Sequence, residues 1–543
     1  MTRGSAWSTV AVTLGVAVAV LLADRVAPVP EVSEDAPSVA ADGAVAGSFV
    51  CAVGDRTEGT VLTTTAARPT GLGSGPAQVE IVSFEDGEQQ TTRLPPVFPG
   101  ADGRTTPAGE SELGTWARWS AGPVAVSREW RWPDSEALPQ ATVAGPCAAP
   151  FSGTWIVPGM STTGGNEAHL RLANPFRSDA TVAVHFLTPA GVEAPLILRN
   201  ITVPSRSVRE IVVNDTLPER DDLAAVVEVA TGRVAAEGYQ LARSAIGDID
   251  GASLLSAAPQ PAEDWTVPWV PDGGGWTSWL WVANPGDRTA TVELTMHTED
   301  GGEVPEGLTE VTVPPQELRR VDLRGTLPDE QSRAAVTVRS NGAPIVVSAA
   351  SLLAADDPVR TAFAVQLGSA APDDLWVVSG GETAGRDERL RVVNPGGEDA
   401  RIDVALFSGV TVLRPDELQD IEVGPGSVTA FELAELLEGA RGWSAFVTAR
   451  GGDVVVGRLG TSVEDALHLV AAPGAPASVW MPDAGALASV HDRDFVRRLG
   501  TPLGMTLDGA EVADPEPEVP SPEQPADSQA EAPTLDEPAD TQG

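Results

Sequence analysis

The sequence predicts an all-β protein made of tandem immunoglobulin-like β-sandwich repeats of about 110 residues, with one N-terminal transmembrane helix before them and a disordered acidic tail after them. Three observations predict this fold: markers recur at a fixed period, apolar residues alternate along short segments, and the composition changes at both ends of the chain. The markers in step are Asn174-Pro175, Asn284-Pro285 and Asn394-Pro395, then Val203, Val313 and Val423, and then Leu217, Leu327 and Leu437. Trp155 and Trp265 keep this period, and Trp376 departs from it by one residue.

The segment that ends at each Asn-Pro is predicted to be a half-buried strand, because its apolar residues alternate with polar ones. Leu170 and Leu172 face the core, and Asn174-Pro175 ends the strand, since proline cannot donate to a sheet. About seven such strands fill each copy, which is the size of an immunoglobulin-like sandwich of antiparallel sheets. The alternative is a β-propeller, whose blades of about 40–50 residues would require two or more blades per copy.

The N-terminus predicts export. Residues 7–23 form an apolar run that Arg3 precedes and Asp24 follows. A basic flank stays in the cytoplasm, so the bulk of the chain is expected to be extracytoplasmic and anchored in the cell membrane by a single pass. The alternative is a signal peptide that is cleaved, which would make the protein secreted.

The first copy is divergent, because Arg68-Pro69 stands where the later copies have Asn-Pro. It also contains both cysteines of the chain, Cys51 and Cys147. Outside the cell two thiols become oxidised, so a disulfide between them is predicted. Such a bridge would compensate for a thinner core in a terminal repeat.

Composition defines the remaining segments. The net charge of −42 excludes the basic footprint of a nucleic-acid-binding protein. The last 36 residues carry 11 acidic groups and no basic one, so they cannot bury enough apolar surface to fold. The predicted segments are a transmembrane anchor at 1–23, a stalk at 24–46, a divergent disulfide-bridged sandwich at 47–150, sandwich repeats at 151–262, 263–372 and 373–482, a C-terminal extension at 483–507, and the tail at 508–543.

The motif L-x-[LV]-[AV]-Asn-Pro, followed by an A-T-V-x-[VL] strand and a V-x-V-P segment, resembles an actinobacterial family of exported, membrane-anchored proteins of unknown function. The resemblance covers roughly residues 1–500. It implies one N-terminal membrane segment followed by tandem β-repeats. It also implies a role near surface polysaccharide, because relatives tend to be encoded beside envelope glycosyltransferases. The family carries no catalytic residues to transfer.

The sequence contains no nucleophile elbow, HExxH motif or Gly-rich phosphate loop. The five histidines do not recur at the repeat period, so no metal site and no cofactor are predicted. The candidate binding patch is instead a group of tryptophans in the third copy: Trp269, Trp276, Trp279 and Trp281. Because Leu280 and Val282 face the core, Trp279 and Trp281 should point the other way, toward a sugar, a protein partner, or a neighbouring domain.

These observations predict a non-catalytic, membrane-anchored extracytoplasmic scaffold or interaction protein of the cell envelope, and not an enzyme. Its expected partners are envelope proteins or surface polysaccharide, together with the membrane through the N-terminal helix, and no nucleic acid. The alternative is a carbohydrate-binding accessory protein in envelope polysaccharide assembly. A minor alternative is an envelope hydrolase.

Overall fold

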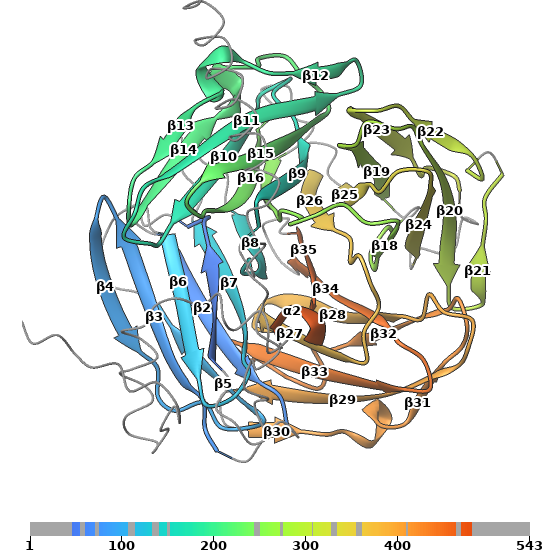
Figure 1. Ribbon diagram of the computed structural model, residues 1–543. Helices are drawn as coiled ribbons and strands as arrows, with labels where there is room; N and C mark the ends of the chain where they lie inside the picture. The colour runs from blue at the N-terminus through green and yellow to red at the C-terminus, as the bar shows by residue number, and fades with distance from the viewer. Residues whose placement is uncertain are drawn as a thin grey trace, which may run out of the picture. The chain divides into compact units, whose positions relative to one another are not determined.

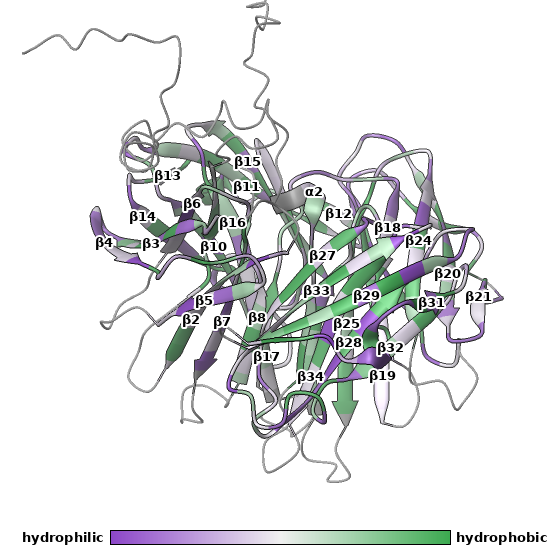
Figure 2. Cartoon of the chain, turned by 90° about the horizontal axis from the view of Figure 1, so that it is seen from below, coloured by the Kyte–Doolittle hydropathy of each residue, from purple (hydrophilic) through white to green (hydrophobic). Residues whose placement is uncertain are grey.

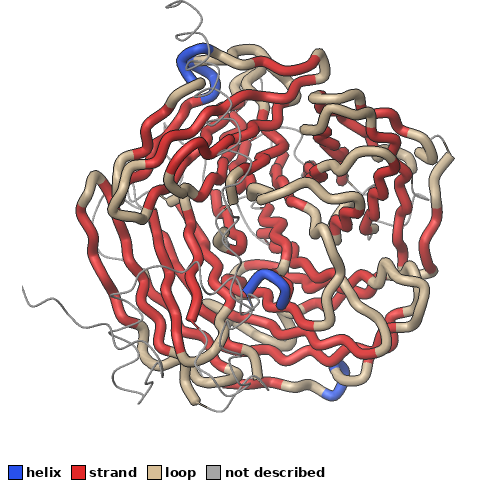
Figure 3. The backbone as a smooth tube through the Cα atoms, in the orientation of Figure 1, coloured by secondary structure: helices blue, strands red, loops and turns tan. Residues whose placement is uncertain are grey.

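The computed structural model describes residues 46–54, 60–70, 75–106, 114–132, 141–148, 152–243, 250–271, 275–306, 308–326, 334–354, 361–408, 411–462 and 469–480. The predicted anchor, extension and tail, and nearly all of the stalk, lie outside these ranges. Over the described residues the protein is almost entirely β-strand (Figure 3). The helical segments are η1 (Leu196–Leu198), η2 (Val213–Asp215), η3 (Asp416–Leu418) and α2 (Ala477–Trp480). No helix in these ranges is both long and apolar enough to cross a membrane.

The strands form four units of two antiparallel sheets each. In every unit we name the sheet that contains the unit's first strand the leading sheet, and the other sheet the trailing sheet. The first unit contains β1 (Ala46–Cys51), β2 (Val61–Arg68), β3 (Gln78–Glu85), β4 (Glu88–Arg93), β5 (Ala101–Thr105), β6 (Gly114–Ser120), β7 (Ala125–Trp132) and β8 (Ala141–Pro146). Its leading sheet has the order β1-β6-β3-β4, and its trailing sheet has the order β5-β2-β7-β8.

The second unit contains β9 (Thr154–Met160), β10 (Asn166–Asn174), β11 (Ala180–Thr188), β12 (Gly191–Glu193), β13 (Ile201–Val203), β14 (Ser207–Val212), β15 (Leu223–Thr231), β16 (Ala235–Arg243) and β17 (Asp250–Leu255). Its leading sheet has the order β12-β11-β15-β9, with β13 also paired to β11. Its trailing sheet has the order β14-β10-β16-β17.

The third unit contains β18 (Asp264–Val267), β19 (Trp276–Asn284), β20 (Ala290–Thr298), β21 (Gly301–Glu303), β22 (Val311–Val313), β23 (Glu317–Asp322), β24 (Ala335–Asn341), β25 (Val346–Ala354) and β26 (Thr361–Leu367). The fourth contains β27 (Leu375–Gly381), β28 (Arg386–Val393), β29 (Ala400–Ser408), β30 (Thr411–Leu413), β31 (Ile421–Val423), β32 (Val428–Glu432), β33 (Trp443–Arg450), β34 (Val455–Ser462), β35 (Leu469–Pro473) and β36 (Ala475–Pro476). Both units repeat the sheet orders of the second, and β36 extends the fourth leading sheet.

Each unit is a sandwich with an apolar core between its two sheets. In the second unit Leu170 and Leu172 from β10 belong to the same buried cluster as Val182, Val184 and Phe186 from β11. None of these five side chains is more than 1% exposed. Burying one such side chain contributes about 1.5–3 kcal/mol, so this layer is a main source of the unit's stability. The prediction of an all-β fold of tandem sandwiches is therefore confirmed.

The Asn-Pro marker holds a turn together by side-chain hydrogen bonds. The Asn174 Nδ2 donates to the Ser178 carbonyl at 2.9 Å and to the Val203 carbonyl at 3.1 Å. Its Oδ1 accepts from the Phe176 amide at 3.0 Å. Asn284 and Asn394 make the equivalent bonds in their own units. The asparagine recurs because it satisfies buried backbone groups of two segments at once.

The recurring tryptophan opens each unit rather than closing the one before it. Trp155 lies on β9, which pairs with β15 of the second unit. Its indole Nε1 donates to the Val234 carbonyl at 2.9 Å, and Trp265 and Trp376 donate to equivalent carbonyls. This bond ties the first strand of a unit to the loop before its eighth, which explains why the residue is tryptophan in each of the last three units.

The four units close on one another. The trailing sheets of the second, third and fourth units each contact the leading sheet of the preceding unit, and that of the first unit contacts the fourth. The strands β8, β17, β26 and β35 contact one another in turn near the centre of Figure 1. Eight sheets about a common centre are also what a propeller with two blades per copy requires.

One expectation about the sheets requires a correction. Alternation predicted that each strand has one face in water, and the polar residues of the Asn-Pro strands were assigned to that face. In β10 the last seven residues are all buried, and β19 behaves in the same way. The reason is that the second face of a trailing sheet packs on the neighbouring unit, so its polar side chains are buried between sheets. Figure 2 shows hydrophobic residues along most strands, with hydrophilic stretches on strands as well as in loops.

Candidate functional site

Trp279 and Trp281 point away from the core of the third unit, as the register predicts, but another sheet covers them. They are 7% and 2% exposed, and their rings are perpendicular, with an interplanar angle of 82°. The Trp281 Nε1 donates to the Asp222 carboxylate of the second unit at 2.6 Å. The Arg320 guanidinium lies 4.2 Å from the Trp279 ring centroid. Such a pair does not offer the open, coplanar surface on which a sugar ring stacks.

The same register position reaches the preceding unit in each of the last three units. Arg171, which corresponds to Trp281, donates from Nη1 to the Gly54 carbonyl of the first unit at 2.5 Å. Arg391 in the fourth unit donates to the Ala334 carbonyl of the third at 2.6 Å. We call the contact between two adjacent units a seam. Tryptophan at position 281 is therefore one form of a hydrogen-bond donor that recurs at the seams.

The other two tryptophans of the candidate patch lie at the next seam. Trp269 is 2% exposed, and the Arg391 guanidinium stacks on it at 3.6 Å from the ring centroid. Trp276 is partly buried against the cluster that contains Trp269 and Leu459. The four tryptophans thus divide between two seams, and the structure does not bring them together into one patch.

A cavity of about 440 Å³ lies where the second and third units meet. Its walls include Trp279, Trp281, Arg320 and Asp221. The tryptophans contribute only the small part of their surface that remains open. A ligand at this seam would meet polar and charged groups more than ring faces.

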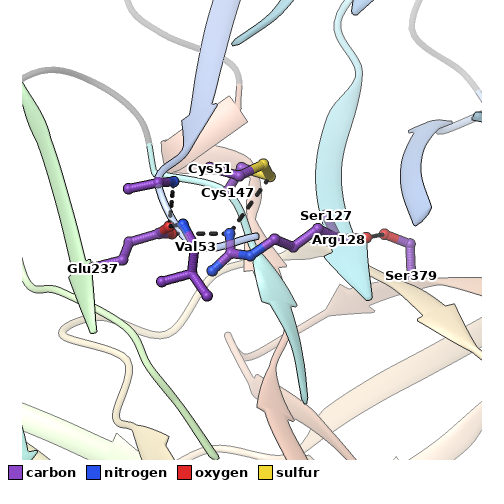
Figure 4. Close-up of a disulfide and its surroundings, with 8 residues drawn as sticks. Cys51, Val53, Ser127, Arg128, Cys147, Glu237 and Ser379 are labelled. Carbon is purple, nitrogen blue, oxygen red and sulfur yellow. Dashed lines mark hydrogen bonds and ion pairs between the residues drawn. A yellow bond between two sulfur atoms is a disulfide. The ribbon is translucent and has the colours of Figure 1, made fainter. Parts of the chain in front are cut away.

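The predicted disulfide between Cys51 and Cys147 is present, and it lies beside a buried ion pair between the first two units (Figure 4). The Arg128 Nη1 lies 3.0 Å from the Glu237 Oε1. The Glu237 Oε2 accepts from the amides of Ala52 and Val53 at 2.6 and 3.1 Å. Burial raises the pKa of Glu237, and the charge of Arg128 opposes that shift. This carboxylate fixes the chain just after β1 to the second unit.

A second buried charge cluster joins the first unit to the fourth. Glu388 is fully buried, and its Oε2 lies 3.9 Å from the Arg458 guanidinium, which also lies 3.6 Å from Glu129. Burial raises the pKa of Glu388 to about 7, with a further upward contribution from Glu129 against the opposing charge of Arg458. Arg131 links Glu129 to Glu382 at 2.6 and 2.7 Å. Three carboxylates and two guanidinium groups thus interact in one cluster inside the protein.

Histidine and carboxylate meet at the seam between the first two units. The His169 Nδ1 and the Tyr239 hydroxyl lie 3.1 and 2.8 Å from the Glu210 Oε1. Burial acts to raise the pKa of Glu210, but the hydrogen bond from His169, the charge of Arg171 and the Tyr239 hydroxyl outweigh it and lower the pKa to about 2. A carboxylate this acidic is a weak general base at neutral pH, so the cluster is suited to holding the seam.

A second cavity, larger than the one beside Trp279, was not predicted from the sequence. It occupies about 810 Å³ between the first leading sheet and turns of the second unit. Five arginines line it: Arg93, Arg118, Arg177, Arg206 and Arg233. The signal that would have found it is the internal alignment of the turns, because sequence reasoning compared the copies only along their strands. Within the described ranges, no group of three or more His, Cys, Asp or Glu residues is placed to hold a metal ion.

The fold and its seams define a class of protein in which tandem β-sandwiches are joined through buried polar side chains. Residues 124–275 and 260–472 match the protein family described as "Family of unknown function (DUF5719)". These segments span more than half of the chain, so the chain belongs to this family. No curated protein matches it. A solved structure of a Thermotoga maritima protein is 22% identical over 20% of this chain and 95% of its own, with a TM-score of 0.18.

Proposed function

We propose that the protein is a non-catalytic scaffold or interaction protein of the cell envelope, anchored by the apolar segment at residues 7–23. The observation that carries the proposal is the use of polar side chains at the seams. Arg171, Trp281 and Arg391 each bind the preceding unit, and the carboxylates near them are paired or hydrogen-bonded. Groups engaged in this way hold adjacent units rigidly against one another.

Two further features support an extracytoplasmic position. The disulfide between Cys51 and Cys147 suits an oxidising compartment. The net charge of −42 suits a soluble surface that repels anionic polymers except where positive groups gather. A rigid body of four units presents several separate faces, which is what a protein that holds partners in place requires.

The proposal is tested by replacing Glu388, the carboxyl group most similar to a catalytic acid. Its raised pKa makes it partly protonated near neutral pH, so Glu388→Gln should fold like the wild type. Cells that carry only this variant should keep the envelope phenotype of the wild type, whereas a deletion should not. Loss of function in the folded variant would show that the protein is an enzyme.

Location is tested separately. The full chain should remain with membranes after washing at alkaline pH, and deletion of residues 1–23 should release it. Protease added outside intact cells should cleave the wild-type chain. Full protection from that protease would overturn the extracytoplasmic assignment without bearing on the question of catalysis.

A further inference from the structure

The second unit carries an exposed apolar turn between β12 and β13. Leu196 and Ile197 in η1 are 77% and 78% exposed, the largest exposed fractions among the large hydrophobic residues of the described ranges. Leu198, the next residue, is buried and belongs to the core cluster of the unit. The turn is therefore held to the sandwich by one leucine and presents the other two side chains to the surroundings. Single exposed apolar residues are ordinary on a protein surface, whereas neighbouring ones indicate a contact site.

The internal repeat shows that the fold does not require apolar side chains at these two positions. The turns at η1 and η3 share one bond: the amide of their last leucine, Leu198 or Leu418, donates at 3.0 Å to the carbonyl of the proline before the turn. Between that proline and leucine the fourth unit has Asp416 and Glu417. The third unit has Glu306 at the first of the two positions. Acidic residues are sufficient in this turn, so the apolar pair of the second unit has a cause outside the fold.

The three turns face different directions. The strands that lead into them are β12, β21 and β30, and Figure 1 shows these strands on three different sides of the closed body. Among the three turns, only that of the second unit has an apolar pair. A flat partner can meet one side of such a body at a time. An apolar pair in a single unit therefore fits a flat partner that approaches from one direction.

The small size of the turn favours a lipid surface over a protein as this partner. A stable protein interface buries about 800 Å² on each partner, whereas the apolar pair is followed closely by the exposed polar residues Arg199 and Asn200. Binding to a bilayer grows with each apolar side chain that enters it, so a small turn can contribute. Arg199 suits this partner as well, because a long basic side chain beside apolar residues reaches lipid phosphate groups.

The chain itself brings a membrane within reach of the turn. The apolar segment at residues 7–23 is the proposed anchor, and residues 24–45 separate it from β1, which begins at Ala46. An extended chain spans at most about 3.6 Å per residue, so this connection holds the start of β1 within about 80 Å of the bilayer. Such a tether raises the effective concentration of the membrane at the turn, and a weak contact is then sufficient.

We propose that Leu196 and Ile197 insert into the outer face of the membrane that anchors the chain, and that this contact fixes how the folded body lies on that membrane. The inference rests on the anchor of the proposed function and deepens it, because it assigns a second membrane contact to the body itself. The partner is the boundary between the headgroups and the acyl chains of the lipids. The apolar pair enters this boundary, and Arg199 lies at the level of the phosphate groups.

The test places a fluorescent probe beside the turn of the full chain, reconstituted in vesicles of phosphatidylcholine and phosphatidylglycerol that include a nitroxide-labelled lipid. Ala194→Cys supplies the thiol for the probe, because Cys51 and Cys147 are joined in the disulfide. The matched probe is carried by Arg414→Cys, since Arg414 stands just before the proline of the fourth unit's turn and is exposed, as Ala194 is. The nitroxide lipid should quench the probe at position 194 and leave the probe at position 414 unquenched.

A variant taken from the fourth unit separates insertion from folding. L196D/I197E gives the turn the residues of η3, so it should keep the melting temperature of the wild type. It should reduce the quenching at position 194 to that at position 414, because loss of two apolar contacts lowers the ratio of docked to free bodies by about 100-fold, at about 10-fold for each. The control is Val412→Thr, which replaces an exposed apolar residue of the fourth unit and should leave the quenching at position 194 unchanged.

The possible failures are distinguishable. A chain that washes off the vesicles would overturn the anchor and this inference together, whereas a retained chain whose probe at position 194 is unquenched would overturn this inference alone. If that probe is unquenched in lipid vesicles but shielded from iodide in native membranes, the turn binds a protein and the lipid assignment is wrong. Quenching that persists in L196D/I197E would show that the apolar pair does not make the contact.

Discussion

Replacing the asparagine of an Asn-Pro turn should destabilise the protein by a predictable amount. Asn174 makes three hydrogen bonds, two through Nδ2 and one through Oδ1, and Asn394 makes the same three. Asn284 makes four, because its Nδ2 also donates to the Pro314 carbonyl at 3.0 Å. Each such bond contributes about 0.5–1.5 kcal/mol net, so Asn→Ala at any of these positions should cost about 2–4 kcal/mol.

Urea unfolding of the full chain, followed by far-ultraviolet circular dichroism, measures this loss. The matched control is Asn200→Ala, because Asn200 is exposed and lies outside any strand, and it should change stability by less than about 0.5 kcal/mol. Asn284→Asp should be at least as damaging as Asn284→Ala at neutral pH, since it turns an oxygen toward carbonyl groups where a donor stood. If all three alanine variants match the Asn200 control, the turns do not depend on the asparagine and the reasoning is wrong.

Three further predictions concern the seams and the first unit. Trp281→Phe removes the bond to Asp222 while keeping a ring, and should cost about 1.5–3 kcal/mol in the same urea assay; no change would mean that the seam does not depend on this donor. The pKa of Glu388 is raised to about 7 from an ordinary value near 4.5, so its contribution to stability is present below about pH 4.5 and is lost as pH rises through 7. Glu388→Gln should therefore lose less stability than the wild type between pH 5 and 8, and parallel pH profiles would contradict this. Reducing the Cys51–Cys147 disulfide, whose cysteines are 96 residues apart, should cost about 4–5 kcal/mol, whereas a C51A/C147A variant should not respond to the reductant.

Sequence reasoning predicted the sandwich and its turns because their causes are local. Alternation along β10 identified Leu170 and Leu172 as core, and the recurring asparagine marked the turn that ends the strand. Both signals depend on neighbouring residues, and the repeat showed them three times. The strands β17 and β26 were not predicted, since these segments do not alternate clearly between apolar and polar residues, and they gain their place from contacts with other strands at the centre.

The seams could not be predicted from one copy at a time. A polar residue between two apolar ones in a strand indicates a face exposed to water, and Arg171 and Arg391 stand in such positions. They are 1% and 0% exposed, because a partner in the adjacent unit supplies a carbonyl oxygen for each guanidinium. Trp281 would be exceptional only if its counterparts Arg171 and Arg391 faced solvent, and they are buried. Which groups supply the acceptors depends on how units meet, and this information is absent from a strand pattern.

Differences between the copies now have two separate physical meanings. Within the trailing strands, both faces are buried, so a change such as arginine to tryptophan at position 281 must be matched by its neighbour, as the Asp222 carboxylate matches the indole N–H. At the turns, packing between units sets no such constraint on the side chain, because glycine is sufficient there in the fourth unit. Arginine at position 206 has φ +53°, and Gln316 and Gly426 have φ +56° and +66° at the same position, so the turn keeps this backbone conformation whatever its side chain. In a closed body of repeats, variation in strands therefore reports on how the units assemble, whereas variation in turns is free of that constraint.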